Sequence, residues 1–223
     1  MDLQLSRYEP LPAPPEDKAA LIEVAVDSLH PTQMCVGWAE IKHRIEDFKA
    51  ESEKDRRDYL LTRPVPVARS SNGQLWMVDR HHRLRGLLEI NPKATAWAYV
   101  VLDVNAASAE IVLQALQQRG WLYLYDGRGI GPRPAEQLPT SLLELEDDPY
   151  RSLVWKLKQE GWIKPQPLIP YHEFRWAAWL RSRPLPPFSS KRLDPALAAA
   201  RQLVCSAAAQ EMPGWKGDKK SCR

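Results

Sequence analysis

Residues 75–88 read LWMVDRHHRLRGLL. The first four are apolar and end at Asp79, and Leu84, Leu87 and Leu88 then recur at the i, i+3, i+4 spacing of one buried helix face. A change from a short apolar run to a helical period predicts a strand that turns directly into a helix. We therefore predict that this strand–turn–helix unit is the centre of the fold.

Polar side chains fill the turn and the first helical positions, namely Arg80, His81, His82 and Arg83. Asp79 occupies the position of an N-cap, where a carboxylate accepts hydrogen bonds from the unpaired amides of the first turn. Those amides and the positive end of the helix dipole favour the binding of an anion. A capped helix with solvated basic side chains explains the same residues about equally well.

The segments around this turn predict a mixed α/β core. Residues 21–26 (LIEVAV) form a mostly apolar strand, which we expect to be central in the sheet. Residues 65–68 precede the turn signal SSNG at 70–73, which predicts a hairpin. Pro66 lacks an N–H group and so predicts an edge position for that strand. Residues 95–101 give a further apolar strand.

Helical periodicity dominates elsewhere. A helix is predicted from Gly37 onward and is expected to continue into the charged residues 51–58. In the second half, Gly120 ends a helix over 111–116, and Asp148 with Pro149 begins another. Further helices are predicted around 172–180 and after Asp194-Pro195, the second of them rich in alanine.

These elements predict four parts of the chain. They are an extended N-terminal arm (1–17), an α/β core (18–105), a helical extension packed on the core (106–212) and a basic tail (213–223).

Composition narrows the class of protein. The formal net charge is +3 and the pI is about 8.7, which is too mild to indicate nucleic-acid binding alone. The three cysteines show no metal-ligand spacing, so no metal site is predicted. The N-terminus lacks an apolar secretory segment, and the longest nearly apolar run, 94–102, is too short to span a membrane. We expect a cytoplasmic protein without membrane association.

The sequence resembles the ParB/sulfiredoxin superfamily, and most closely the group called putative ParB-like nucleases. Four segments carry this resemblance, the first two in the core of that fold and the last two in its helical part. They are residues 23–33 with the sequence HPTQ at 30–33, VDRHHR at 78–83, LYDG at 124–127 and DDPYRSL at 147–153.

The resemblance implies an α/β fold of mixed type, with a ParB/sulfiredoxin-like core and a helical C-terminal extension. In that superfamily the corresponding turn cradles nucleotide phosphates or supports phosphoryl transfer, so Asp79, His81, His82 and Arg83 inherit the role of the site. Two departures matter. His81 stands where sulfiredoxin has its reactive cysteine, which argues against redox chemistry, and Arg80 stands where many members have glycine.

The two histidines are expected to divide their roles. Adjacent helical residues project about 100° apart, so His81 and His82 do not readily bind one metal ion. One imidazole is expected to face the site and transfer a proton, while the other braces the turn. Asp79 is a helix cap more than a base in this interpretation, and Arg83 with His82 would bind phosphate. Arg80 would either add a phosphate contact or block the close approach that a glycine allows.

Other polar residues are ambiguous from the sequence. Thr32 and Gln33 follow the first strand, where site residues are expected, yet a polar turn explains them equally well. Asp126 fits a turn-forming Asp-Gly, and Asp147 with Asp148 fit helix capping. His172-Glu173 is predicted to be structural, and Cys35 to be a small buried side chain.

Three functions remain open at this stage. The first is a nuclease or phosphotransfer enzyme that acts on phosphate esters of a nucleotide or nucleic acid. The second is a non-catalytic nucleotide-sensing protein, and the third, a DNA-binding protein, is weakest because no basic helix-turn-helix stands out. The sequence identifies no cofactor, although magnesium could enter with a nucleotide, and it does not define the oligomeric state.

Overall fold

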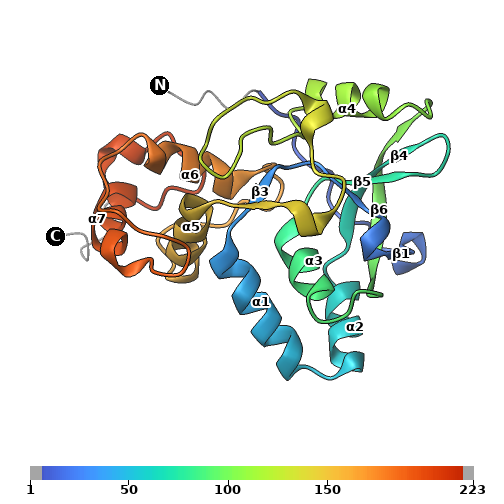
Figure 1. The fold of residues 1–223 in the computed structure, drawn as a ribbon, viewed down its shortest axis with the longest axis horizontal. Coiled ribbons are helices and arrows are strands. Elements are labelled where there is room, and N and C mark those ends of the chain that lie inside the picture. Colours follow the sequence, from blue (N-terminus) through green and yellow to red (C-terminus); the bar gives the residue numbers. More distant parts are fainter. Residues whose placement is uncertain (1–6, 218–223) are drawn as a thin grey trace.

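The computed structural model describes residues 7–217, so most of the basic tail predicted over 213–223 lies outside the described residues. A five-stranded mixed sheet lies at the centre (Figure 1). Its strands, in spatial order, are β1 (Ile22–Ala25), β6 (Thr95–Val104), β4 (Val65–Ser70), β5 (Leu75–Met77) and β2 (His30–Pro31). The predicted mixed α/β fold is confirmed.

The order of the strands corrects two expectations. β1 pairs only with β6 and is an edge strand, although its apolar sequence predicted a central one. β4 is central, between β6 and β5, despite Pro66. The proline is tolerated because the pairing with β5 begins one residue later, at Val67, while the Pro66 carbonyl still accepts a hydrogen bond from the Val78 N–H.

Helices cover both faces of the sheet. Alternate residues of a strand point to opposite faces, so Met77 packs with α1 and α3 while Trp76 packs with α4. The first face carries α1 (Trp38–Ala50), α2 (Glu53–Leu61) and α3 (His81–Leu88), and the second carries α4 (Ala109–Gln118). The helix predicted to run through 51–58 is instead broken, because the Ser52 hydroxyl caps a new helix by accepting from the Asp55 N–H.

Three C-terminal helices build a second apolar core beside the sheet, seen at the left of Figure 1. They are α5 (Pro149–Gln159), α6 (His172–Arg181) and α7 (Asp194–Cys205). The predicted cap of α5 is confirmed, because Asp148 accepts from the amides of Tyr150 and Arg151. Short strands β3 (Cys35–Val36) and β7 (Glu146–Asp147) pair in parallel and join the two cores.

Shorter pieces complete the chain. Among residues 7–217, five 3-10 helices span Lys18–Ala20, Val26–Ser28, Ala135–Gln137, Leu142–Glu144 and Ala207–Ala209. The N-terminal segment is extended, and its Leu11 is buried against the α4 side of the sheet, with Trp121 in the same cluster. Across residues 7–217 no helix combines the length and apolar composition needed to cross a bilayer.

Candidate functional site

The turn between β5 and α3 adopts a conformation that the sequence did not predict. Asp79 is not the N-cap of α3; that position belongs to Arg80, and no side chain caps the helix. The Asp79 carboxylate instead accepts the Arg80 N–H at 2.7 Å and the Arg80 guanidinium at 2.7 Å. The first turn of α3 therefore lacks a side-chain cap, a state that favours anion binding.

Arg80 lies in the left-handed region, with φ 77° and ψ 11°. A side chain with a Cβ is disfavoured there by about 1–2 kcal/mol, whereas glycine adopts this conformation freely. The glycine that the family resemblance implies at this place would adopt the same backbone without strain. Arginine keeps the same backbone and adds a cation beside the turn.

The two histidines hold backbone segments on either side of the turn. His81 Nε2 accepts from the Thr32 N–H at 3.1 Å, and His82 Nε2 accepts from the Gly37 N–H at 2.9 Å. Burial lowers the pKa of His81 well below its usual value. Burial, with the positive charge of Arg151, lowers the pKa of His82 to about 3. Both imidazoles are therefore neutral near pH 7.

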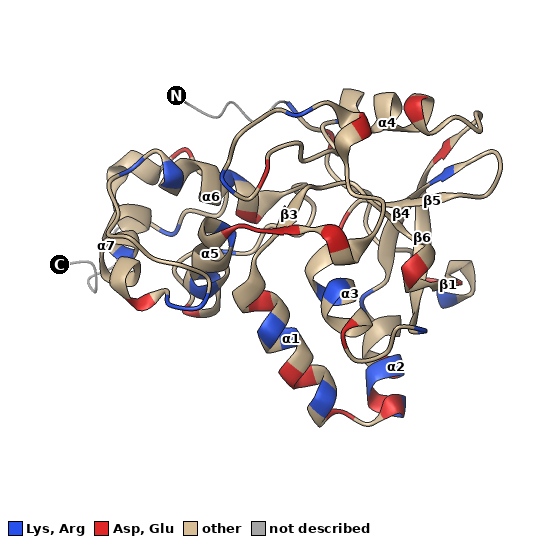
Figure 2. Cartoon of the chain, in the orientation of Figure 1, with Lys and Arg blue, Asp and Glu red and all other residues tan. Residues whose placement is uncertain are grey.

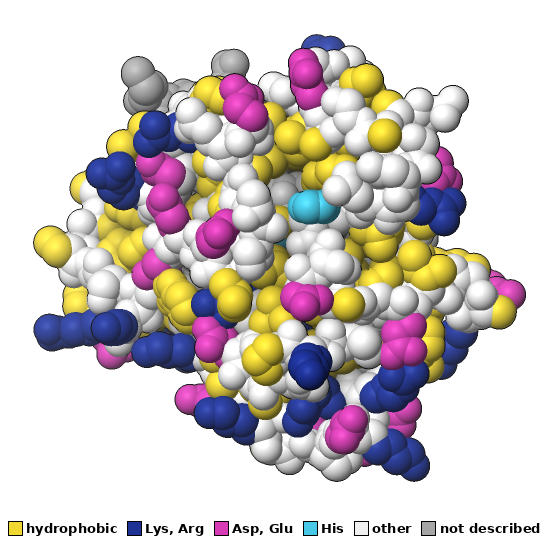
Figure 3. All heavy atoms as spheres, turned by 45° about the vertical axis from the view of Figure 1, so that its right-hand side comes forward, with side chains coloured by type: hydrophobic (Ala, Val, Ile, Leu, Met, Phe, Trp, Pro, Cys, Tyr) yellow, Lys and Arg dark blue, Asp and Glu magenta, His cyan; other side chains and the backbone are white. Residues whose placement is uncertain are grey.

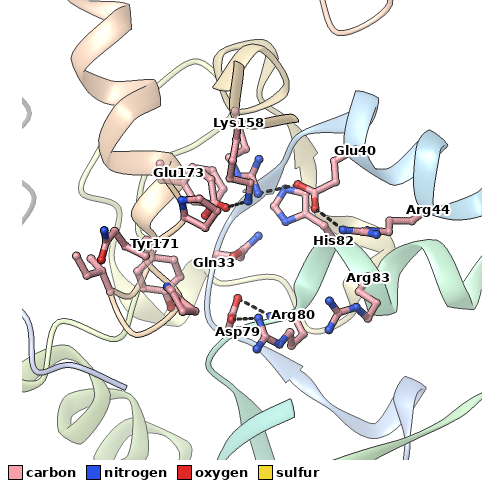
Figure 4. Close-up of a pocket in the computed structure, with 16 residues that line it drawn as sticks. Gln33, Glu40, Arg44, Asp79, Arg80, His82, Arg83, Lys158, Tyr171 and Glu173 are labelled. Atoms are coloured by element: carbon pink, nitrogen blue, oxygen red, sulfur yellow. Dashed lines mark hydrogen bonds and ion pairs between the residues drawn. The ribbon is translucent and has the colours of Figure 1, made fainter. Parts of the chain in front are cut away.

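A pocket of about 230 Å³ opens at this turn (Figure 4). It is bounded by α1, the β5–α3 turn, α5 and the segment that leads into α6. Its lining residues are Gln33, Glu40, Arg44, Asp79, Arg80, His82, Arg83, Arg151, Lys158, Pro165, Gln166, Pro167, Ile169, Tyr171, Glu173 and Phe174.

Three arginines form the rim of this pocket. Arg44, Arg80 and Arg83 come from α1, the turn and α3 and lie along one side of the close-up in Figure 4. Burial lowers the pKa of Arg83; the Tyr59 hydroxyl opposes this effect, and the neighbouring charges of Arg80 and Arg44 lower the pKa further. The positive charges of the three arginines therefore act on one another across the rim.

The floor of the pocket contains two ion pairs. Arg151 donates to Glu40 at 2.8 Å, and its charge overcomes the effect of burial and lowers the pKa of Glu40 to about 2. Lys158 pairs with Glu173, whose pKa is lowered by Arg151 and Lys158 despite burial. Within residues 7–217, each of the four pocket arginines has at least one buried guanidinium nitrogen without a hydrogen-bond acceptor.

The structure brings five of the seven predicted site residues to the pocket. They are Gln33, Asp79, Arg80, His82 and Arg83. His81 and Thr32 do not line it; they lie behind the turn, where the Thr32 hydroxyl donates to the Met77 carbonyl at 2.7 Å.

The simpler interpretations of two other residues are confirmed. Asp126 accepts from the Arg128 and Ile130 amides within its own loop, as a turn-forming aspartate does. Cys35 is fully buried.

Several pocket residues were missed from the sequence. The sequence predicts Glu173 to be structural. It gives no reason to single out Glu40, Arg44 or Lys158, because charged residues on helices are usually solvated. Arg151 offered a signal, since it belongs to the segment 147–153 that carries the family resemblance.

Metal binding is not indicated by the side chains of the pocket. Within residues 7–217, no group of three or more His, Cys, Asp or Glu side chains is arranged to hold a metal ion. The nearby carboxylates of Glu40 and Glu173 are instead paired with Arg151 and Lys158.

The fold and the site together define a class of protein with a mixed α/β core and a basic pocket at its central strand–helix turn. Comparison with protein families assigns it more closely: the chain belongs to the family described as "Putative ParB-like nuclease", whose model matches residues 22–182. The crystal structure of protein Atu1540 from Agrobacterium tumefaciens is similar, with 28% sequence identity and a TM-score of 0.75. The similarity covers 89% of this chain and 99% of that one. No curated protein matches the chain.

Proposed function

We propose that the pocket binds a phosphate group of a nucleotide or nucleic acid, and that the protein is a nuclease or phosphotransfer enzyme acting on phosphate esters. The observation that carries this proposal is the rim of Arg44, Arg80 and Arg83 beside the uncapped first turn of α3. Guanidinium groups match phosphate oxygens in geometry and charge, and uncapped helical amides add further donors.

The charges of the pocket favour an anion at the rim and not at the floor. The cations of the floor, Arg151 and Lys158, are paired with Glu40 and Glu173. On the rim Asp79 pairs with Arg80, and Arg44 lies 3.6 Å from Glu40 and 3.5 Å from Asp47, so among the described residues Arg83 is the rim arginine without a carboxylate partner. Arg83 makes just a long contact of 3.4 Å with the Arg63 carbonyl and lies over the Tyr59 ring, so it is the strongest candidate for a phosphate contact.

Roles in a hydrolytic step can be assigned from exposure and from the hydrogen bonds already made. The side chain of Asp79 is 40% exposed at the rim, so we assign it as the general base. His82 already accepts a hydrogen bond on Nε2, so we assign it, with His81, to holding the turn and the Gly37 and Thr32 backbone in place. Magnesium would enter with a nucleotide, bound mainly by its phosphates.

A nucleotide-sensing protein without turnover is the second candidate. One observation favours it: the pKa of His82 is about 3, so the imidazole that lines the pocket is not a proton donor near pH 7. Binding and hydrolysis must therefore be measured on the same samples.

The test removes one rim arginine. Arg83→Ala should weaken binding of inorganic phosphate and of mononucleotides by about 1.5–3 kcal/mol, the value of a charge-assisted hydrogen bond. The matched control is Arg69→Ala, which removes the same charge from an exposed arginine paired with Asp103 on the sheet. Calorimetric titration and release of product from single-stranded DNA are measured for the parent and both variants.

Each outcome decides between the candidates. Equal affinities of Arg83→Ala and Arg69→Ala for phosphate would refute the phosphate site. Turnover by the parent that Asp79→Asn abolishes, with binding retained, supports the enzyme. Phosphate-dependent binding without turnover for any nucleotide or DNA supports the sensing protein.

A further inference from the structure

The charge of the chain is divided unevenly between its two parts. Residues 150–217 contain eleven Lys and Arg but four Asp and Glu, a net charge of +7. Residues 7–149 contain 17 Lys and Arg and 22 Asp and Glu, a net charge of −5. The small overall charge hides this asymmetry. Figure 2 shows the basic residues on α5–α7 and their loops, and Figure 3 shows Lys and Arg at the left-hand edge of the surface.

Part of this positive charge gathers where α5 ends. Three cations, Lys156, Arg201 and Lys216, contact Glu160 or Gly161, and Lys164 lies three residues further along the chain. We name these four residues the α5-end cluster. Lys216 Nζ donates to the Gly161 carbonyl at 2.8 Å, while Arg201 and Lys156 contact Glu160 at 2.8 and 3.9 Å. Lys164 joins them through its N–H, which donates to the Gly214 carbonyl at 2.8 Å.

The α5-end cluster adjoins the pocket along the chain. Pro165, Gln166 and Pro167 line the pocket, and Lys164 immediately precedes them. Lys164 therefore adjoins this wall of the pocket, and its N–H contact with Gly214 brings the segment that carries Lys216 beside it.

Local structure accounts for only part of the positive charge in the cluster. The carboxylate of Glu160 neutralises one cation, Asp194 lies near enough to Arg201 to help raise its pKa, and the C-terminal end of a helix supplies about half a negative charge. More than one positive charge is left over, and the lysine side chains are accessible: Lys156 is 42% exposed, and Lys164 and Lys216 are exposed. Such a surplus on one surface is typical of polyanion binding.

We infer that the α5-end cluster binds the backbone of a single-stranded nucleic acid whose neighbouring phosphate occupies the pocket. The inference rests on the proposed function only for the phosphate in the pocket. Trp162 and Trp215, both partly buried, lie in the same segments as the cations, and tryptophans beside cations are typical of surfaces that bind single strands. An anionic membrane is less favoured, because Leu168 is the one exposed large hydrophobic side chain among residues 150–217.

The test reverses two charges of the cluster. Lys164→Glu combined with Lys216→Glu should weaken binding of a short fluorescent oligothymidylate about tenfold or more at low salt. The slope of log affinity against log salt should become shallower by about 1.4, since each lost contact to a single strand contributes about 0.7. Inorganic phosphate should bind as in the parent. The control is Lys18→Glu with Lys93→Glu, which makes the same charge change at exposed lysines of the acidic part.

The outcomes separate this inference from the phosphate site. An equal loss of oligothymidylate affinity in both double variants, or no loss in either, overturns the α5-end cluster as the binding surface. Sedimentation with phosphatidylserine vesicles, without oligothymidylate binding, overturns it in favour of a membrane. An effect of the cluster variant together with no effect of Arg83→Ala keeps the cluster and refutes the phosphate site.

Discussion

At the scale of single residues, Arg80 contributes both a left-handed backbone conformation and a charged side chain to the site. Its left-handed conformation ends β5 and begins α3, and its guanidinium holds Asp79 at the rim. The sequence indicated that residue 80 is unusual but not why, because φ depends on how the strand and the helix pack on either side of it.

We expect the backbone strain at Arg80 to be measurable. Arg80→Gly should exceed Arg80→Ala in free energy of unfolding by about 1 kcal/mol, because both lose the guanidinium and only alanine retains the strain. Urea denaturation of the two variants gives this difference. At Arg83, inside α3, the same pair should show the opposite sign, since glycine is worse than alanine in a helix by about 0.5–1 kcal/mol. The same sign at both positions would contradict the explanation.

The buried histidines predict acid sensitivity. His81 and His82 have lowered pKa values in the folded protein, so below pH 6.5 the unfolded chain binds protons that the folded protein does not. Stability should be complete above pH 6.5 and fall as the pH decreases toward 3, by up to about 1.4 kcal/mol per pH unit for each group. The pKa values of His30 and His172 are also lowered in the folded protein.

Urea denaturation over this pH range tests the effect, with His82→Gln as the comparison. The variant lacks one of the titrating groups, so its decline with falling pH should be shallower than that of the parent. Identical slopes would show that His82 does not contribute.

At the scale of elements, local chemistry predicted where helices and strands begin better than where they lie. Asp148-Pro149 begins α5, and the SSNG hairpin joins β4 to β5, because caps and turns involve neighbours in sequence. The predictions that β1 is central and that β4 lies at the edge were wrong, because the position of a strand in the sheet depends on partners far along the chain. The rule that proline belongs in an edge strand fails for Pro66, because the pairing of β4 with β5 begins only at Val67.

Helix α5 links the two cores. Leu157 is fully buried among the C-terminal helices, while Arg151 and Ser152 of the same helix contact α1 through Glu40 and the Ala39 N–H. We propose that the predicted core and extension unfold together. Leu157→Ala should then reduce the free energy of unfolding by about 2–5 kcal/mol in one transition, seen equally by tryptophan fluorescence and circular dichroism. Limited proteolysis that releases a stable fragment ending near residue 105 would contradict this.

At the scale of the whole molecule, the site could be predicted only in part. The turn at 79–83 was recognised because its residues are consecutive. The remaining walls come from Glu40, Arg151 and Glu173, which meet only after α1, α5 and α6 have packed together. Nothing in the sequence around Glu40 distinguishes a buried, paired carboxylate from a solvated one. The charge asymmetry was visible in the sequence but became meaningful only once the structure had separated the two parts.

The extended segment before β1 also has a consequence for the pocket. The Glu9 N–H donates to the Arg119 carbonyl and the Leu11 N–H to the Leu168 carbonyl, so the segment fastens the end of α4 to the stretch leading into α6. Leu168 directly follows pocket residue Pro167. Prolines 10, 12, 14 and 15 stiffen the segment beforehand and lower the entropy lost when it docks. The segment therefore acts as a strap, so the position of one pocket wall depends on residues far from the turn at 79–83.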